Sequence, residues 1–319
     1  MKLNEAIKTY NKPFLSMEIV PPRKGSDIET IFNSIETFLP FNPKFISVTN
    51  HQTQFEFKEI NGNILKNPKN KQAGPVGLAG AIRHRYQIEP IPHLICGGTN
   101  RFQLENVLVD LQFLGIDNIF VVRGDANNGR KFEAEKDGFH YATEIVEQVA
   151  AMNQGKYTFP AENLSATNFC VGVAAYPEKH YEALNMQSDL INLKKKINAG
   201  ADFIITQMFF DFNIYKNFVK TLHDAGIDVP VIPGIKPIIK KKILDMIPRA
   251  FFIDIPHKLV ELFDRARTEA EEFKAGTIYM TELIEELIDF GVPAIHLFTM
   301  GKGKSAKALL KNITNSLQE

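Results

Sequence analysis

One charged pair in this chain follows directly on an apolar, β-branched segment, at Arg123, Gly124 and Asp125. The segment before it has the composition of a buried strand. Gly124 can adopt backbone conformations that other residues avoid, so the chain can turn or approach a ligand closely there. A cation, a flexible joint and an anion at a strand end are typical of the binding end of an α/β protein.

A carboxylate lies inside a second apolar segment, at Glu18. Burial would deprive this group of solvation, raise its pKa and suit it to donate a proton near neutral pH. The alternative is a structural glutamate paired with an arginine or lysine. Position alone does not separate these two interpretations.

His93 lies in the segment Pro90-Ile-Pro-His-Leu-Ile95 and is a further candidate, although a single histidine is more often a hydrogen-bonded core residue. The sequence contains no HxH or HExxH motif and no cluster of His with Asp or Glu at metal spacing. A catalytic metal is therefore not expected.

The segment 187–196 predicts a helix with one polar face, because Asp189, Asn192 and Lys196 recur at i, i+3 and i+7. Lys195 and Lys196 could reach a phosphate, while Asp189 and Asn192 could bind a polyol. The alternative is an ordinary solvated charged face.

Two nucleotide-binding motifs are absent. The loop Met300-Gly-Lys-Gly-Lys-Ser305 resembles a P-loop, but Phe298 occupies the position of its first glycine, which excludes nucleotide triphosphate hydrolysis. No GxGxxG motif follows a strand, so a Rossmann cofactor site is not supported.

Short segments rich in Val, Ile and Phe predict the elements that position these residues. They lack clean alternation, as buried parallel strands do. We expect eight strands, at residues 14–20, 44–49, 89–95, 118–123, 168–174, 202–207, 230–235 and 294–299. Helical patterns lie between them, at residues 26–38, 99–114, 138–152, 187–199, 212–225 and 273–290.

Eight strands alternating with helices predict an α/β fold, a (β/α)8 TIM barrel, with the site at the carboxyl ends of the strands. The competing fold is a two-domain doubly wound protein. No linker rich in Gly, Ser or Pro divides the chain, so we expect residues 1–319 to form a single domain. Two segments, near 51–74 and 153–167, look irregular. The first could fold over the active-site face, and the second should lie at the opposite end.

Composition limits the kinds of partner. Lys+Arg and Asp+Glu both total 37, and this balance argues against a protein of nucleic acids or membrane surfaces. Cys96 and Cys170 are far apart in the sequence and form no CxxC motif, which fits buried thiols in a reducing cytoplasm. The first residues lack an apolar signal segment, so we expect a cytoplasmic protein.

Eight segments together resemble the methylenetetrahydrofolate reductase family, and they occur in matching order from about residue 14 to 299. They are Met17-Glu-Ile-Val-Pro-Pro-Arg23, Phe45-Ile-Ser-Val-Thr49, Pro92-His-Leu94, Val122-Arg-Gly-Asp125, Val173-Ala-Ala-Tyr-Pro-Glu-Lys-His180, Asp189-Leu-Ile-Asn-Leu-Lys-Lys-Lys196, Ile205-Thr-Gln-Met-Phe-Phe-Asp211 and Ile232-Pro-Gly-Ile235. Each lies at a predicted strand end or on an adjoining helix.

The resemblance implies a barrel that holds FAD and reduces 5,10-methylenetetrahydrofolate to 5-methyltetrahydrofolate for methionine synthesis, with NADH or NADPH as electron donor, by ping-pong hydride transfer. It implies catalytic roles for Glu18, the general acid that opens the imidazolidine ring, and for Asp125. Substrate contacts would come from Gln207 and Lys302. Flavin-contacting positions match Thr49, His93, Arg123, Gly124, Asp125, Ala174, Tyr176, His180, Asp189, Asn192, Lys195 and Lys196.

The sequence departs from the family pattern in places. Gly301-Lys302 replaces Asn-Arg, and lysine lacks the bidentate fork of arginine. The chain ends soon after the expected barrel, so we expect no regulatory domain and no inhibition by S-adenosylmethionine. By analogy with the family, we expect a homo-oligomer. The alternatives are another FAD barrel, such as a proline dehydrogenase, and a folate- or flavin-binding protein without catalysis.

Overall fold

The computed structural model describes residues 1–23, 25–69, 72–124, 132–158, 162, 164–299 and 303–318. Its main sheet is parallel, with the order β10-β11-β1-β2-β5-β6-β7-β8-β9. The strands are β1 (Phe14–Ile19), β2 (Phe45–Val48), β5 (Glu89–Ile95), β6 (Asn118–Val122), β7 (Cys170–Ala175), β8 (Phe203–Thr206), β9 (Val231–Ile232), β10 (Gly234–Ile235) and β11 (Ala294–Phe298). All eight predicted strands are present.

The sheet closes on itself because the two ends of this order are consecutive pieces of one stretch, residues 231–235. β9 pairs with β8 and β10 pairs with β11. Pro233 separates the two pieces; it has no N–H to donate, but its carbonyl accepts a hydrogen bond from the backbone of His296. The fold is therefore the predicted (β/α)8 barrel.

Side chains that point into the barrel form layers, since alternate residues of a strand face the same side. The lower layer is apolar and includes Phe14, Phe45 and Phe203, all buried. Gly172 lies beside this layer, and a Cβ there would come within 2.3 Å of the Phe203 ring. Two or four residues further along the strands, the interior positions become polar, as Glu18 illustrates. The barrel thus has an apolar base and a polar mouth.

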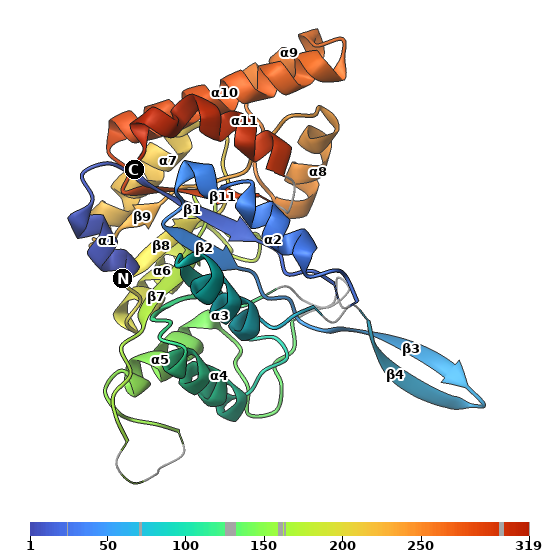
Figure 1. Ribbon diagram of the computed structural model, residues 1–319, viewed down its shortest axis with the longest axis vertical. Coiled ribbons are helices and arrows are strands. Elements are labelled where there is room, and N and C mark those ends of the chain that lie inside the picture. Colours follow the sequence, from blue (N-terminus) through green and yellow to red (C-terminus); the bar gives the residue numbers. More distant parts are fainter. Residues whose placement is uncertain are drawn as a thin grey trace.

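Helices surround the barrel (Figure 1). They are α1 (Leu3–Thr9), α2 (Glu29–Glu36), α3 (Pro75–Tyr86), α4 (Arg101–Phe113), α5 (Ala142–Met152), α6 (Met186–Asn198), α7 (Phe212–Asp224), α8 (Lys242–Phe251), α9 (His257–Arg265), α10 (Glu269–Phe290) and α11 (Gly303–Ile313). Helices α1, α3, α8, α9 and α11 were not predicted from the sequence. In the described part of the chain, no helix is both long and apolar enough to cross a membrane.

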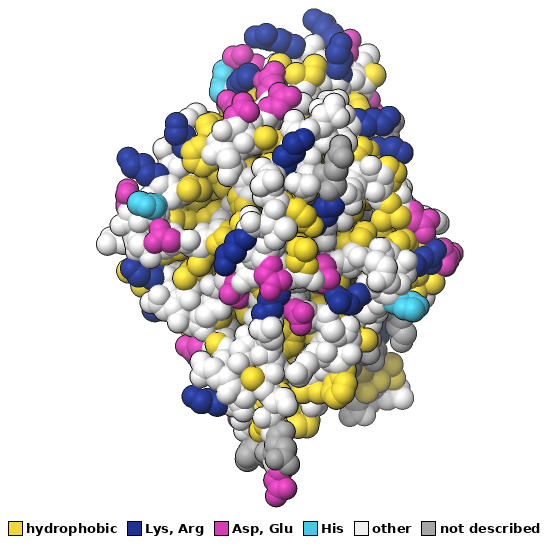
Figure 2. All heavy atoms as spheres, turned by 60° about the vertical axis from the view of Figure 1, so that its left-hand side comes forward, with side chains coloured by type: hydrophobic (Ala, Val, Ile, Leu, Met, Phe, Trp, Pro, Cys, Tyr) yellow, Lys and Arg dark blue, Asp and Glu magenta, His cyan; other side chains and the backbone are white. Residues whose placement is uncertain are grey.

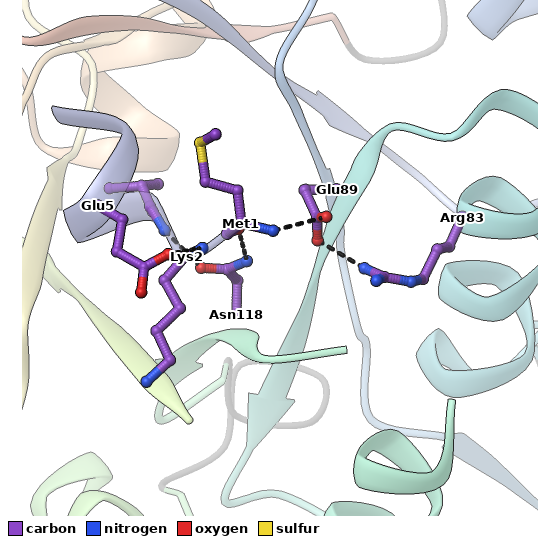
Figure 3. Close-up of polar contacts among 7 residues, drawn as sticks. Met1, Lys2, Glu5, Arg83, Glu89 and Asn118 are labelled. Carbon is purple, nitrogen blue, oxygen red and sulfur yellow. Dashed lines mark hydrogen bonds and ion pairs between the residues drawn. The ribbon is translucent and has the colours of Figure 1, made fainter. Parts of the chain in front are cut away.

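Helix α1 closes the base of the barrel. Leu3 and Ala6 are fully buried against the lower apolar layer. Asn118 at the start of β6 binds the segment that leads into α1, since its Oδ1 accepts from the Leu3 N–H at 2.7 Å and its Nδ2 donates to the Met1 carbonyl at 3.0 Å. Glu89 at the start of β5 contacts the Met1 amine and Arg83, at 2.8 and 2.7 Å (Figure 3).

The segment near 51–74 was predicted to be irregular, and that prediction is wrong. Strands β3 (Gln54–Ile60) and β4 (Asn63–Lys69) form an antiparallel hairpin there. Asn61 and Gly62 join them with φ of 53° and 76°, the values of a type I′ turn. The hairpin extends away from the barrel instead of folding over its mouth (Figure 1).

The segment near 153–167 follows α5, and its first residue, Asn153, lies at the base, as predicted. The Asn153 side chain accepts a hydrogen bond from the Phe169 N–H, immediately before β7 begins, at 2.8 Å. Cys96 and Cys170 are buried free thiols, also as predicted, and burial raises the pKa of each to about 12. Acidic and basic side chains are interspersed over the face that Figure 2 shows, in keeping with the balanced composition.

Candidate active site

The carboxyl ends of the strands surround a cavity of about 350 Å³. A polar residue of nearly every strand reaches it, as the sequence predicted. The predicted site residues that line it are Glu18, Thr49, His93, Arg123, Gly124, Ala174, Tyr176, His180 and Gln207. Residues from opposite ends of the chain therefore meet at this one mouth.

Glu18 projects from β1 between two histidines. Its Oε2 lies 3.8 Å from Nε2 of His93, on β5, and 3.8 Å from Nε2 of His296, on β11. His296 is 1% exposed, and its Nδ1 lies 2.9 Å from the hydroxyl of Ser16. The Thr299 hydroxyl donates to the Glu18 carbonyl at 2.7 Å and so fixes the strand end. The carboxylate is thus held at the centre of a buried polar cluster.

The structure corrects the expected pKa of Glu18. Burial does raise it, but the neighbouring imidazoles of His296, His93 and His51 favour the carboxylate and lower it more, so the pKa of Glu18 lies below its ordinary value. The sequence revealed the burial of Glu18 but not its histidine neighbours. With the cavity open to water, Glu18 is a carboxylate at neutral pH.

His93 presents an unsatisfied nitrogen at the cavity. Burial lowers its pKa to about 4, which makes it neutral at pH 7 despite the attraction of Glu18. Its Nε2 is buried and has no hydrogen-bond partner among the residues that the structure describes. Since a buried polar atom without a partner is costly, this nitrogen is suited to contact a ligand. The described residues include no group of three or more His, Cys, Asp or Glu suited to hold a metal ion.

The ends of β6 and β7 form the opposite wall. Gly124 has φ of 85°, the positive value that the sequence suggested. Arg123 pairs with Glu182 at 2.5 Å and lies over the Phe132 ring at 5.1 Å. Beyond β7, Tyr176 and His180 make an edge contact at 4.6 Å. This wall combines a cation with aromatic surface.

Helix α6 carries the predicted polar face beside this wall. Oδ2 of Asp189 accepts a hydrogen bond from the His180 backbone at 2.8 Å, and Lys196 donates to the Ala174 carbonyl at 2.5 Å. Burial lowers the pKa of Lys196 to about 8, against the opposing attraction of Asp189. Asn192 and Lys195 are exposed. Asp189 and Lys196 therefore hold the loop after β7 and the end of β7 itself.

Sequence reasoning missed several residues that line the cavity, above all His296 and Lys236. Lys236 follows β10 and is buried, and burial lowers its pKa although Glu18 opposes this. His296 interrupts the apolar run Ala294-Ile-His-Leu-Phe298, the same signal that identified Glu18. Two other predicted residues, Asp125 and Lys302, lie outside the described residues.

Comparison with known proteins relates the whole chain to one family. A family model described as methylenetetrahydrofolate reductase matches residues 2–314. The chain is 31% identical to 5,10-methylenetetrahydrofolate reductase of Pectobacterium carotovorum over 296 residues, and 32% identical to that of Escherichia coli over 301 residues. Each match covers 92% of this chain and 88% of the relative.

A plant relative is longer. Methylenetetrahydrofolate reductase (NADH) 1 of Arabidopsis thaliana is 28% identical over 327 residues, and the match covers 98% of this chain but 51% of the plant protein. Among solved structures, an uncharacterised protein from Clostridium thermocellum that binds two copies of 5-methyl-5,6,7,8-tetrahydrofolic acid superposes with a TM-score of 0.62. It is 16% identical, with 98% of both chains covered, so the two share a fold.

Proposed function

Since this chain belongs to the methylenetetrahydrofolate reductase family, we propose that it reduces 5,10-methylenetetrahydrofolate to 5-methyltetrahydrofolate, with FAD as cofactor and NADH or NADPH as electron donor. The observation that carries this proposal is the buried carboxylate of Glu18 between His93 and His296 at the cavity floor. A proton donor at that position is what the folate half of the reaction needs.

The residues present fit FAD. The unpartnered Nε2 of His93 and the hydroxyl of Thr49 offer polar contacts for a flavin ring. Lys196 offers a partly buried cation for the diphosphate. When bound, FAD supplies a two-electron carrier that takes hydride from a reduced nicotinamide and delivers it to the folate. We assign its binding to Thr49, His93, Arg123, Gly124, Asp125, Ala174, Tyr176, His180, Asp189, Asn192, Lys195 and Lys196.

Glu18 is the general acid in this proposal. The five-membered ring of the substrate must open to an iminium before its methylene carbon can accept hydride, and opening requires a proton on the departing nitrogen. Ligands that fill the cavity exclude water, which raises the pKa of Glu18 and lets the carboxylate take up that proton. We therefore expect the folate half-reaction to slow as pH rises above the pKa of Glu18 in the complex.

Gln207 is the proposed contact to the pterin. Its Oε1 accepts from the Met208 N–H at 2.9 Å, which leaves the amide NH₂ to donate to the substrate. Asp125 would stabilise the cationic iminium, and Lys302 would meet an anionic part of the folate. Both of these assignments rest on the family resemblance.

A carboxylate-binding barrel such as a proline dehydrogenase is less well supported. Among the described residues that line the cavity, Arg123 is the one arginine, and it is paired with Glu182. A site that binds a substrate carboxylate through arginines would require further arginines at the cavity.

The test is an anaerobic absorption titration of the purified protein. Flavin bands should bleach with NADH or NADPH and return with methylenetetrahydrofolate. Bleaching without recovery would remove the folate substrate from the proposal. Absence of the flavin bands after incubation with FAD would remove FAD from the proposal.

Glu18→Gln separates the two half-reactions. We expect flavin reduction to persist and the folate step to slow by a factor of about 10² to 10⁴, the usual contribution of a general acid. Glu147→Gln, on the exposed face of α5, is the matched control and should leave both steps unchanged. A folate step at the parent rate in Glu18→Gln would remove the general-acid role.

The biological setting follows the same proposal. The product would serve methionine synthesis in the cytoplasm. Residues 1–319 would form one catalytic domain with insertions near 51–74 and 153–167, acting as a homo-oligomer on small folate and nicotinamide substrates.

A further inference from the structure

We propose that the outer edge of β3 is a self-association surface, at which β3 of one copy pairs antiparallel with β3 of a second copy of this chain. The two-fold axis would pass through Phe57. The proposal rests on the hairpin alone and does not depend on the proposed function.

Within the described residues, the hairpin adds to no larger sheet. In the part of the chain that the structure describes, β3 and β4 pair only with each other, and Figure 1 shows them extending from the barrel. Phe57, Ile60, Ile64 and Leu65 are between 46% and 73% exposed. Because an isolated two-stranded hairpin is marginally stable in water, this arm would gain from further strands.

The turn determines which backbone groups point outward. A two-residue type I′ turn makes Ile60 and Asn63 a hydrogen-bonded pair. Hydrogen-bonded and non-hydrogen-bonded pairs alternate along an antiparallel ladder, so Lys58 and Glu56 also direct their backbone groups toward β4. Phe57 and Glu59 direct theirs away from it. The outer edge of β3 therefore offers a row of backbone donors and acceptors.

The two edges of the hairpin differ. The same alternation puts Pro68 at an outward position on β4, and proline has no N–H to donate. Proline on an edge strand discourages pairing with another chain. No proline occurs in β3. The edge of β3 is thus the one suited to receive a further strand.

The sequence of β3 is complementary to itself about Phe57. In the antiparallel dimer, Phe57 would face Phe57 of the second copy, and Glu59 would face residue 55 of the second copy. In each of these pairs, the two backbones would exchange both hydrogen bonds. Glu56 would face Lys58 of the second copy. These two charges already share one face of the strand, with Lys58 Nζ 2.9 Å from Glu56 Oε1.

Other registers are less favourable. An axis through Glu59 would oppose two carboxylates, which is destabilising across a strand pair. An axis through Glu56 or Lys58 would oppose like charges and would also use backbone groups that already face β4. The axis through Phe57 combines outward backbone groups with opposite charges and a central aromatic pair.

Cross-linking tests this geometry directly in the full chain. Residues of a hydrogen-bonded antiparallel pair lie about 5.5 Å apart at Cα, within disulfide range. Phe57→Cys should form a covalent dimer under mild oxidation. Ile64→Cys, on the outward edge of β4, is the matched control and should not. The native thiols at Cys96 and Cys170 are buried.

Charge exchange tests the register. Glu56→Lys and Lys58→Glu each place like charges across the axis, and each should weaken self-association about tenfold in sedimentation equilibrium. The double variant restores opposite charges and should return to the parent affinity. The two single variants, when mixed, should associate with each other.

Two results would overturn the proposal. One is a parent protein that stays monomeric at its highest soluble concentration. The other is an oligomer whose mass and affinity are the same in the parent, the single charge variants and the outward-edge variant Phe57→Pro. Circular dichroism of each variant verifies that the barrel is intact.

Discussion

Glu18 and His93 share one buried space, and each affects the protonation of the other. Glu18 attracts the protonated form of His93, but burial of the ring outweighs this and leaves the pKa of His93 at about 4. His296 and His51 also face the pair and oppose a further positive charge. A neutral imidazole with an open nitrogen therefore stands beside an ionised carboxylate.

This low pKa makes stability depend on pH. The ordinary pKa of histidine is 6.5, so between pH 6.5 and about 4 the unfolded chain binds more protons than the folded protein. The free energy of unfolding should fall as pH falls through this range, by about 3 kcal/mol in total. Glu18, whose pKa is lowered, loses its own contribution only at lower pH, below its ordinary value of 4.5.

Urea unfolding at pH 7 and pH 5 measures this effect in the parent and in His93→Asn. The variant should lose less stability on acidification than the parent. His84→Asn, at an exposed position on α3, is the control and should follow the parent. Equal losses in parent and His93→Asn would mean that protonation of His93 is not resisted by the fold.

The polar residues of the cavity differ in how far sequence could identify them. Glu18 interrupts an apolar strand and was recognised on that basis. His296 gives the same signal, but its partner Ser16 is 280 residues away, and only barrel closure brings them together. The lowered pKa of Glu18 depends on that closure, so local burial alone predicted the wrong direction.

The barrel strands were predictable because each is a short apolar run buried on both sides. The hairpin was not, because its two strands lack a continuous apolar run, and Phe57, Ile60, Ile64 and Leu65 are exposed there. Only the Asn61-Gly62 pair marks its turn. Helix α1 was missed because it is a short segment whose stability comes from docking on the barrel base.

The docking of α1 depends on Asn118, which is fully buried at the start of β6. Asn118→Ala would leave the Leu3 N–H without an acceptor and should lower the free energy of unfolding by about 2 kcal/mol. Denaturant unfolding measures the change. Asn198→Ala, at the exposed end of α6, is the control and should stay within about 0.5 kcal/mol of the parent.

Hydrogen exchange of α1 would separate local from global effects. If Asn118→Ala matched the parent in both stability and the protection of α1, the apolar contacts of Leu3 and Ala6 would be sufficient to hold the helix.

At the scale of the whole molecule, two large apolar clusters lie on different sides of the barrel. One includes residues of α4, α5 and β6, and the other includes residues of α8, α10 and β11. The two clusters can unfold as one cooperative unit only if the closed ring of strands connects them. The connection at one side is the interrupted stretch of β9 and β10, where the sheet has its shortest strands.

Gly234 determines how closely that connection packs. A Cβ there would lie 2.1 Å from the Thr206 carbonyl oxygen and 2.7 Å from the Phe298 ring, and the backbone atom cannot rotate away. Gly234→Ala should therefore lower the free energy of unfolding by about 3 kcal/mol. Gly77→Ala is the matched control, since its added Cβ meets nothing within 4 Å and lies in helix α3. That change should raise stability by about 0.5 kcal/mol.

Hydrogen exchange then distinguishes opening of the connection from general loosening. If closure joins the two clusters into one cooperative unit, Gly234→Ala should lower protection in α4 and α10 by similar amounts. Loss in α10 with α4 unchanged would mean that the two sides unfold separately and that the ring does not couple them. A Gly234→Ala protein as stable as the parent would show that the backbone of this connection moves to accept the added methyl group. Barrel closure would then tolerate movement where β8 meets β9.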